Sequence, residues 1–431
     1  MDSTLEDPVE KTQGERVSSR RTIFAGVIGN VLEWYDFSVY GFFAAIIATQ
    51  FFPSDDPSVS LIAAFGAFAA GFLMRPIGAA IFGHIGDRIG RIHALQLSVL
   101  LMAIPTVAIG LLPNYDSIGI AAAVIMVILR MMQGLAVGGE YTSSIVFLAE
   151  HAPTGKRAFY SIWSVFGGLV GTLLGSAVGA ILSAALSEEA LHSWGWRAAF
   201  LSGILVTVAG YFLRRGLIEN PVRSEGKAPL VVAFSTCGRD ILRVMGINVV
   251  NAIAFYMIFV YAITWLVENV HTKEATALEI NTIALLVLLT LIPFFAILSD
   301  RYGRRLFILI GMGGVAVFAY PLVWLMHHSD FTMILAGQVG FAILCACFAG
   351  GIPAYMCELF PGAVRVTAVS ISYNITLGIM GGTSPMVAVW LINRTHDDMA
   401  FAWYITAAAV FSFLVALTIK DKRNEPLDMA R

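Results

Sequence analysis

The chain has 431 residues, of which 58% are hydrophobic and only 13% are charged. Ordinary soluble domains are about 45–50% apolar and about 25% charged, so this composition excludes a soluble globular protein and indicates an integral membrane protein. The formal net charge of −2 says little about partners. We expect no nucleic-acid partner, because membrane topology explains the placement of the basic residues better.

Apolar segments long enough to cross a bilayer, which takes about 20 residues each, follow one another through the chain. We predict an all-α integral membrane protein with twelve transmembrane helices, at residues 21–50, 59–84, 92–112, 117–149, 157–186, 195–214, 240–268, 277–298, 305–327, 331–357, 364–392 and 399–419. The polar residues before the first segment contain no apolar core followed by a small-residue cleavage site, so we expect no cleaved signal peptide.

Lysine and arginine residues gather in the predicted loops on one side of the membrane. The predicted loops on the other side keep only Arg197, Lys273 and Arg394. By the positive-inside rule the basic side is cytoplasmic, and it includes both termini. Two cytoplasmic termini require an even number of spans, in agreement with twelve. The multi-pass chain is expected in a bacterial inner (cytoplasmic) membrane.

Two short motifs occur once in each half of the chain. GHIGDRIGR (83–91) returns as AILSDRYGR (296–304), and EHAPTGKR (150–157) returns as ELFPGAVR (358–365). The same order in both halves implies a duplicated unit, divided by the polar stretch RRGLIENPVRSEGKAPL. We predict an N-terminal tail at 1–20, a six-helix bundle at 21–216, a cytoplasmic linker at 217–238, a second six-helix bundle at 239–420 and a C-terminal tail at 421–431.

Four stretches resemble a known transporter family. They are GNVLEWYDFSVYGF, AAGFLMRPIGAAIFGHIGDRIGR, RMMQGLAVGGEY and WGWRAAF. They are similar to the major facilitator superfamily and, more narrowly, to its metabolite:proton symporter family, which includes α-ketoglutarate permeases, citrate:proton symporters and proline/betaine transporters. The resemblance implies two pseudo-symmetric six-helix bundles, a substrate site between them near the membrane midplane, and alternating access.

The branch of this family is less clear from the motifs. GFLMRPIG, ELFPGAVR and SYNITLGIMGG are similar to α-ketoglutarate permeases, whereas NVLEWYDFSVYGF, VGGEYTSS and FGGLVGTLLG are similar to proline/betaine transporters. Some osmosensing members of the second branch carry a C-terminal coiled coil, and no heptads follow the last predicted span. We therefore predict proton-coupled import of a mono-, di- or tricarboxylate. Uptake of a zwitterionic osmolyte such as proline or betaine is the alternative.

The first apolar segment carries two acids, Glu33 and Asp36, and Asn30 and Tyr40 continue the polar positions at helical spacing. A carboxylate that faced lipid would cost roughly 2.5–3.5 kcal/mol, so these side chains should face the protein interior. Intramembrane acids of transporters are candidates for proton relay. We predict that Glu33, Asp36 and Glu140 couple the proton, although either acid of the first segment could instead serve helix packing.

Arginines deep in predicted spans are the natural partners of these acids and of an anionic substrate. Arg75 and Arg130 are the Lys or Arg residues placed well within spans, and Arg75 could instead be a structural ion-pair partner. Tyrosine and asparagine side chains of the second half suit hydrogen bonding to substrate. The predicted substrate-binding residues are Arg130, Arg75, Asn30, Tyr40, Gln133, Tyr256, Tyr373 and Asn374.

The repeated loop motifs are expected to form a cytoplasmic gate in the outward-facing state. Their acids have arginines and helix N-termini as possible partners, and each such hydrogen bond is worth about 1.5–3 kcal/mol. The predicted gate residues are Asp87, Arg88, Arg91, Asp300, Arg301, Arg304, Glu150, Arg157, Glu358 and Arg365.

No metal or cofactor is expected. Cys345 and Cys347 form a C-x-C without further ligands nearby, and no phosphate-cradling loop or Cys/His spacing is present. The chain lacks the clustered nucleophile and base of an intramembrane enzyme, so we predict no enzymatic activity. A channel or sensor on the same helices is the other alternative. The expected partners are a small-molecule substrate, protons and the lipid bilayer, and the chain is expected to act as a monomer.

Overall fold

The computed structural model describes residues 27, 30–31, 33–88, 91–214 and 229–427. Within these ranges, the side chains of residues 83–88, 91–96, 99–100, 140, 206–214 and 229–232 are outside the description. The described residues form helices joined by turns and short loops, with no strand among them.

The first half of the chain begins with helical residues 33–42. It continues with α2 (Ala44–Phe51), α3 (Pro57–Leu73), α4 (Arg75–Arg88), α5 (Arg91–Leu111), α6 (Tyr115–Ile118), α7 (Ile120–Val137), α8 (Glu140–Glu150), α9 (Arg157–Ala185), α10 (Glu188–Ala190), a π-helical turn (Leu191–Gly195) and α11 (Trp196–Arg214).

The second half repeats the pattern of long helices with local breaks. It comprises α12 (Pro229–Tyr256), a π-helical turn (Met257–Tyr261), α13 (Ala262–Glu268), α14 (Glu274–Tyr302), α15 (Arg304–Met326), α16 (Phe331–Ala349), α17 (Ile352–Leu359), a 3₁₀ turn (Gly362–Val364), α18 (Arg365–Thr376), a π-helical turn (Leu377–Gly381), α19 (Gly382–Thr395) and α20 (Ala400–Ala416).

Eight helical segments of the described chain are long and apolar enough to cross a membrane. They are Pro57–Phe82, Ile120–Glu150, Arg157–Ala185, Ala233–Glu268, Glu274–Tyr302, Arg304–Met326, Phe331–Leu359 and Gly362–Thr395. Leu101–Leu111 and Ala400–Ala416 are shorter apolar helices. The prediction of an all-helical membrane protein is confirmed for the described residues, and twelve spans stay a prediction.

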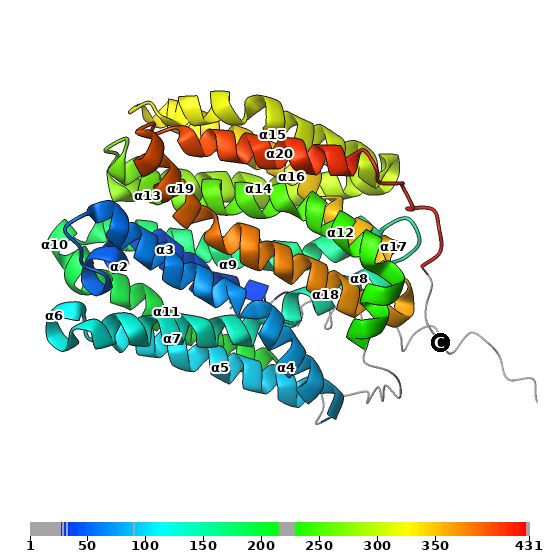
Figure 1. The fold of residues 1–431 in the computed structure, drawn as a ribbon, viewed down its shortest axis with the longest axis horizontal. Helices are drawn as coiled ribbons and strands as arrows, with labels where there is room; N and C mark the ends of the chain where they lie inside the picture. The colour runs from blue at the N-terminus through cyan, green and yellow to red at the C-terminus, as the bar shows by residue number, and fades with distance from the viewer. Residues whose placement is uncertain (1–26, 28–29, 32, 89–90, 215–228, 428–431) are drawn as a thin grey trace, which may run out of the picture.

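The helices run side by side along the long axis of the molecule (Figure 1). Helices α5, α7 and α11 lie along one side and α15, α16 and α20 along the opposite side, so the two halves of the sequence occupy different sides of the molecule. Between them, α9 packs against α14 and α3 packs against α19. The described chain after α20 lies towards the end of the molecule where α4, α8, α17 and α18 meet (Figure 1).

The fourth and tenth predicted spans are both interrupted at a Gly-Gly pair. Gly138 and Gly139 separate α7 from α8, and Gly350 and Gly351 separate α16 from α17. A Cβ atom on Gly138 would lie 2.1 Å from the carbonyl oxygen of Arg75. Glycine is therefore needed at this position for α7 to approach α4 so closely.

Candidate functional site

A small cavity lies between the two halves, near the middle of the long helices. Its volume is about 50 Å³, and its walls come from the first helix, from α8, α9, α12, α14, α16 and α18, and from the π-helical turn that follows α18. The lining residues are Trp34, Tyr141, Val165, Gly168, Leu169, Asn251, Phe255, Leu288, Ile292, Cys345, Phe348, Ala349, Tyr373 and Leu377. None of these described side chains is charged.

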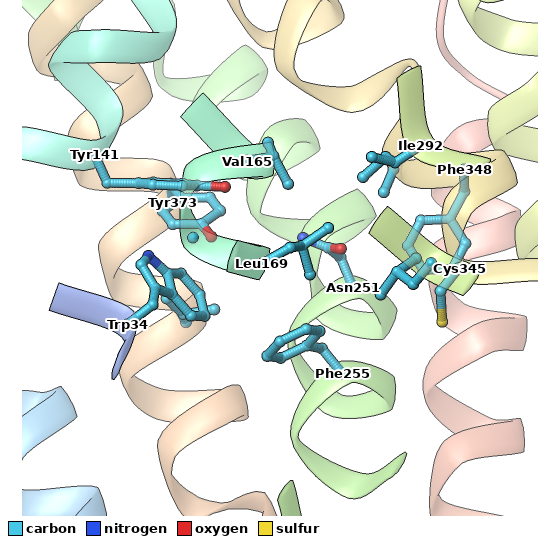
Figure 2. Close-up of a pocket in the computed structure, with 14 residues that line it drawn as sticks. Trp34, Tyr141, Val165, Leu169, Asn251, Phe255, Ile292, Cys345, Phe348 and Tyr373 are labelled. Carbon is cyan, nitrogen blue, oxygen red and sulfur yellow. The ribbon is translucent and has the colours of Figure 1, made fainter. Parts of the chain in front are cut away.

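Aromatic rings form one wall of the cavity. Figure 2 shows Trp34, Tyr141 and Tyr373 grouped together with Phe255 below them, whereas Phe348 and Cys345 lie on the far side. The ring centroids of Tyr141 and Tyr373 are 5.1 Å apart in a stacked arrangement, and Trp34 lies 5.7 Å from both Tyr141 and Phe255. The buried indole N–H of Trp34 has no hydrogen-bond partner in the described part of the chain.

Glu33 and Arg75 form a buried ion pair next to this wall. The Nη2 atom of Arg75 donates to Oε1 of Glu33 at 3.1 Å. The guanidinium carbon of Arg75 lies 4.4 Å from the centre of the Phe72 ring and 5.7 Å from that of Trp34. Neither Glu33 nor Arg75 is among the lining residues. Arg75 therefore has the ion-pair partner that its alternative interpretation expected.

Asp36 belongs to a second, separate group of polar side chains. Thr106 Oγ1 lies 2.6 Å from Oδ2 of Asp36, and the Gln133 amide donates to the same hydroxyl oxygen at 2.8 Å. Arg130 Nη1 donates to Gln133 Oε1 at 2.7 Å. A chain of hydrogen bonds thus connects the Asp36 carboxylate with the Arg130 guanidinium through two neutral side chains, and all four residues are buried.

Arg130 is enclosed mainly by aromatic rings. Its guanidinium carbon lies 4.5 Å from the centre of the Phe37 ring and 4.3 Å from that of Tyr40. Its Nε and Nη2 atoms are buried without a hydrogen-bond partner among the described residues, and no described acid forms an ion pair with it. The Tyr40 hydroxyl donates to the carbonyl of Ala64. Arg130 is therefore held as a cation by ring faces and by Gln133.

Of the predicted substrate-binding residues, Tyr373 lines the described cavity. Asn30 instead donates to Ser144 and to the Ser164 carbonyl, and Asn374 donates to the Gly138 carbonyl across the two halves. The other predicted residues that lie outside the cavity wall are Arg130, Arg75, Tyr40, Gln133 and Tyr256.

Sequence reasoning also missed residues of this site. Trp34, Tyr141 and Phe255 were not selected, although Trp34 directly follows Glu33 and Tyr141 directly follows Glu140 in the family motifs. Thr106 was not selected either, because a single threonine in an apolar helix gives little signal. Glu140 begins α8, and its side chain lies outside the described part of the structure.

At one end of the molecule, the two copies of a repeated motif form ion pairs with each other across the two halves. Arg157 pairs with Glu358 at 3.5 Å, and Arg365 pairs with Glu150. These residues occupy equivalent positions in EHAPTGKR and ELFPGAVR, so each acid bonds to the arginine of the other copy. Arg304 adds a bond to Glu358 at 2.9 Å.

Asp300 ties the same end together through backbone groups. Its carboxylate accepts the N–H groups of Ala158 and Phe159 at 3.0 and 2.9 Å, at the N-terminus of α9, and pairs with Arg304 at 2.7 Å. The favourable dipole of a helix N-terminus adds to these bonds. Arg301, by contrast, is exposed and lies over the Tyr302 ring at 5.3 Å. The side chains of the remaining predicted gate residues lie outside the description, namely Asp87, Arg88 and Arg91.

A second contact layer joins the halves farther along α9. Ser176 Oγ lies 2.8 Å from the Thr282 hydroxyl and accepts from Asn281 at 3.1 Å, and Gln338 donates to Asn281 at 2.7 Å. The ion pairs of Asp300, Glu358 and Arg365 form the first such layer, which we call the ion-pair layer. On α9, the cavity residues Val165 and Leu169 fall between these two layers. At about 1.5 Å of rise per residue, each layer lies roughly 10 Å from the cavity. The halves therefore touch on both sides of it.

In the part of the chain that the structure describes, no group of three or more His, Cys, Asp or Glu residues could hold a metal ion. The four cysteines are buried and unpaired.

The chain matches two family models. Residues 22–222 match a model described as "Sugar (and other) transporter", and residues 244–428 match one described as "Major Facilitator Superfamily". Among solved structures, the chain is similar to the proton:xylose symporter XylE bound to 6-bromo-6-deoxy-D-glucose, with a TM-score of 0.75 and 19% identity over 95% of this chain and 97% of that one. At this identity the likeness shows the fold.

Curated relatives are more similar in sequence. The chain is 34% identical to the proline/betaine transporter of Escherichia coli (strain K12) over 424 residues, which are 95% of this chain and 85% of the relative. It is 33% identical to the glycine betaine/proline/ectoine/pipecolic acid transporter OusA of Dickeya dadantii (strain 3937), over 95% of this chain and 84% of the relative. These names favour the osmolyte alternative over the predicted organic acid. The chain is a transporter rather than an enzyme, and it belongs to the major facilitator superfamily, in the family that includes the proline/betaine transporters.

Proposed function

We propose that the chain is a proton-coupled symporter that imports a small zwitterionic osmolyte of the proline or betaine kind into bacteria. The names of the relatives over nearly the whole chain support this substrate class. The proposal keeps the predicted architecture: twelve spans in two six-helix bundles at 21–216 and 239–420, both termini in the cytoplasm, and a monomer in the inner membrane that works by alternating access.

The uncharged wall of the cavity is the observation that carries the substrate class. A di- or tricarboxylate would bring net negative charge into an apolar site without a cation in its wall, and burial of an unpaired charge is costly. A zwitterion brings no net charge. The aromatic faces of Trp34, Tyr141 and Tyr373 suit its ammonium group, and the indole N–H of Trp34 and the amide of Asn251 are donors for its carboxylate.

The small volume of the cavity supports a cycle in which the site widens. A space of about 50 Å³ has room for a few water molecules, and an osmolyte with several heavy atoms needs more. The contact layers on either side of the cavity are the natural gates. The ion-pair layer of Asp300, Glu358 and Arg365 would open towards the cytoplasm, and the layer of Ser176, Asn281 and Gln338 would open outward.

We assign the binding of the coupled proton to Asp36, and Glu33 is the alternative residue for this role. Both are buried, but Glu33 is already paired with Arg75. Asp36 bonds to a neutral hydroxyl and reaches its cation, Arg130, only through two intervening side chains. A carboxyl group in such a setting can exist in the neutral or the charged form, as proton coupling requires.

Transport by the purified protein in proteoliposomes tests the function. With an inward proton gradient, labelled proline or glycine betaine should accumulate, an uncoupler should abolish the accumulation, and α-ketoglutarate and citrate should neither accumulate nor compete. Accumulation of a carboxylate without that of either osmolyte would overturn the proposal. Asp36→Asn should no longer accumulate substrate but should still exchange substrate down its own gradient. If this variant still accumulates substrate, the proton-binding role would be assigned to Glu33 instead.

A further inference from the structure

We propose that Thr106 is a positioning residue that transmits the protonation state of Asp36 to Arg130 through Gln133. The idea rests on the proposed proton-coupled function. Its observation is the position of one hydroxyl among three partners: Thr106 Oγ1 lies 2.6 Å from Asp36 Oδ2, 2.8 Å from the Met102 carbonyl and 2.8 Å from the Gln133 amide nitrogen.

The number of hydrogens decides what this arrangement can do. A threonine hydroxyl has one hydrogen and two lone pairs. Gln133 donates to one lone pair, and two acceptors, Asp36 and the Met102 carbonyl, compete for the hydrogen. Many helical threonines bond only to the carbonyl four residues earlier. Thr106 has this bond as well, and the contact with Asp36 is additional to it.

Both protonation states of Asp36 fit the same heavy-atom positions. When Asp36 is charged, Thr106 donates its hydrogen to the carboxylate in a short, charge-assisted bond. When a proton from the solvent has bound to Oδ2, that carboxylic O–H donates to Thr106 Oγ1, and the threonine hydrogen turns to the Met102 carbonyl. One hydrogen bond reverses its direction, and no covalent bond other than the new O–H is made or broken.

The reversal changes the bond that holds Gln133. In the charged state Thr106 accepts one bond and donates to an anion, which polarises its oxygen and strengthens the bond from Gln133. In the neutral state Thr106 accepts two bonds, so the Gln133 amide is held more weakly. The other end of this amide, Oε1, holds Arg130 at 2.7 Å. Protonation therefore loosens Arg130, whose remaining neighbours are mainly ring faces.

Among the described residues, no other charged group lies between the hydrogen-bonded residues that connect Asp36 with Arg130. The groups that face Asp36 are Thr106 from α5, Arg130 from α7 and, on its own helix, the phenol of Tyr35. From α11 it faces the backbone of Gly203, where an added Cβ would lie 2.9 Å from Oδ1. Among the described residues, Arg130 is thus the one ion that can respond to the charge on Asp36.

Thr106→Val tests the proposal because valine has the shape of threonine and lacks the hydroxyl. We expect the accumulation ratio of glycine betaine under a proton gradient to fall about tenfold, as for the loss of one hydrogen bond to a charged group, and the pH dependence of uptake to flatten. Exchange of substrate should continue. Thr106→Ser, which keeps the hydroxyl, should restore the pH profile.

Thr376→Val is the matched control, because Thr376 is also buried and donates to the carbonyl four residues earlier, at Ser372, but lies outside the Asp36 chain. It should keep the pH profile of the wild type. If Thr106→Val cannot be purified, Gln133→Leu breaks the same chain and should flatten the profile too. If the pH profile of Thr106→Val is that of the wild type, Thr106 does not have the proposed role. The same result in Gln133→Leu decides the question if Thr106→Val cannot be purified. Asp36→Asn tests proton coupling separately. Accumulation by Asp36→Asn would instead remove the proton assignment on which the role rests.

Discussion

Trp34 links the buried ion pair with the cavity at the scale of single residues. Its ring forms part of the cavity wall and lies 5.7 Å from the guanidinium carbon of Arg75. The contact with Gly168, where an added Cβ would lie 3.0 Å from the indole nitrogen, fixes how closely α9 approaches this ring. A change at Trp34 should therefore act on the proposed substrate site, and it also removes one ring face beside Arg75.

We expect Trp34→Leu to raise the KM for glycine betaine by about tenfold, because a desolvated cation–π contact is worth up to about 2 kcal/mol. Trp34→Phe keeps a ring face and should have a smaller effect. Uptake kinetics at several substrate concentrations measure both. Trp163→Leu is the control, since Trp163 packs against Phe159 and Phe166 and does not line the cavity. An unchanged KM in Trp34→Leu would remove this ring from the substrate site.

Asp300 carries a second prediction at this scale. Asp300→Asn removes the charge that pairs with Arg304 and that accepts two N–H groups of α9, a loss of about 1.5–3 kcal/mol for a charged hydrogen bond. If the bonds close the cytoplasmic side, a cysteine at Val165 should react faster with a maleimide in the Asp300→Asn variant in inverted vesicles.

Asp240→Asn is the control for this experiment. Asp240 also pairs with an arginine, Arg243 at 2.5 Å, but the pair is partly exposed and lies within one helix. It should leave the reactivity of the cysteine at residue 165 unchanged. Equal reactivity in the wild type and the Asp300→Asn variant would show that Asp300 does not hold a gate.

At the scale of helices, close packing in the first half depends on glycine. A Cβ atom on Gly134 of α7 would lie 1.7 Å from the carbonyl oxygen of Gly71 on α3. Gly134→Ala should therefore force the two backbones apart and lower the melting temperature of the purified protein, since overpacking costs typically about 1–3 kcal/mol. Gly139→Ala should melt like the wild type, because nothing lies within 4 Å of its added Cβ. Equal melting of the two variants would contradict this account of the α3–α7 contact.

The helices themselves could be predicted from the sequence because apolar length alone specifies them. Each of the eight described segments that could span a membrane coincides with a predicted span to within a few residues, apart from the longer segment Ala233–Glu268. The π-helical turns at 257–261 and 377–381 were not predicted. They depend on one extra residue in a turn, which leaves the apolar pattern almost unchanged.

The partners of the polar residues could not be predicted in the same way. Asn30, Glu33 and Asp36 follow one another at intervals of three, and each step falls about 60° short of a full turn. The side chains therefore wind around the helix and meet different neighbours, namely α8 and α9, then α4, then α5. Spacing along one helix gives relative directions, whereas the neighbouring helices are known only from the packing.

At the scale of the whole molecule, both α9 and α14 contribute residues to the two contact layers and to the cavity between them. Along α9, Ala158 lies in the ion-pair layer, Leu169 at the cavity and Ser176 in the second layer. Along α14 the order is reversed, from Thr282 past Ile292 to Asp300, because these helices run antiparallel. A rotation of one half against the other can therefore open one layer while the other stays closed, as alternating access requires.

Which of the two contact layers is the cytoplasmic gate depends on which end of the molecule faces the cytoplasm, and single cysteines can determine it. Asp55 and Asn424 are exposed, and they lie towards opposite ends, before α3 and beyond α20 respectively (Figure 1). The four native cysteines are buried, so they should give little background. In intact cells an impermeant maleimide should label Asp55→Cys and spare Asn424→Cys until the membrane is permeabilised, because in the proposed topology the basic end with the ion-pair layer faces the cytoplasm. If only Asn424→Cys were labelled in intact cells, the protein would have the opposite orientation in the membrane. The ion-pair layer would then be the outer gate.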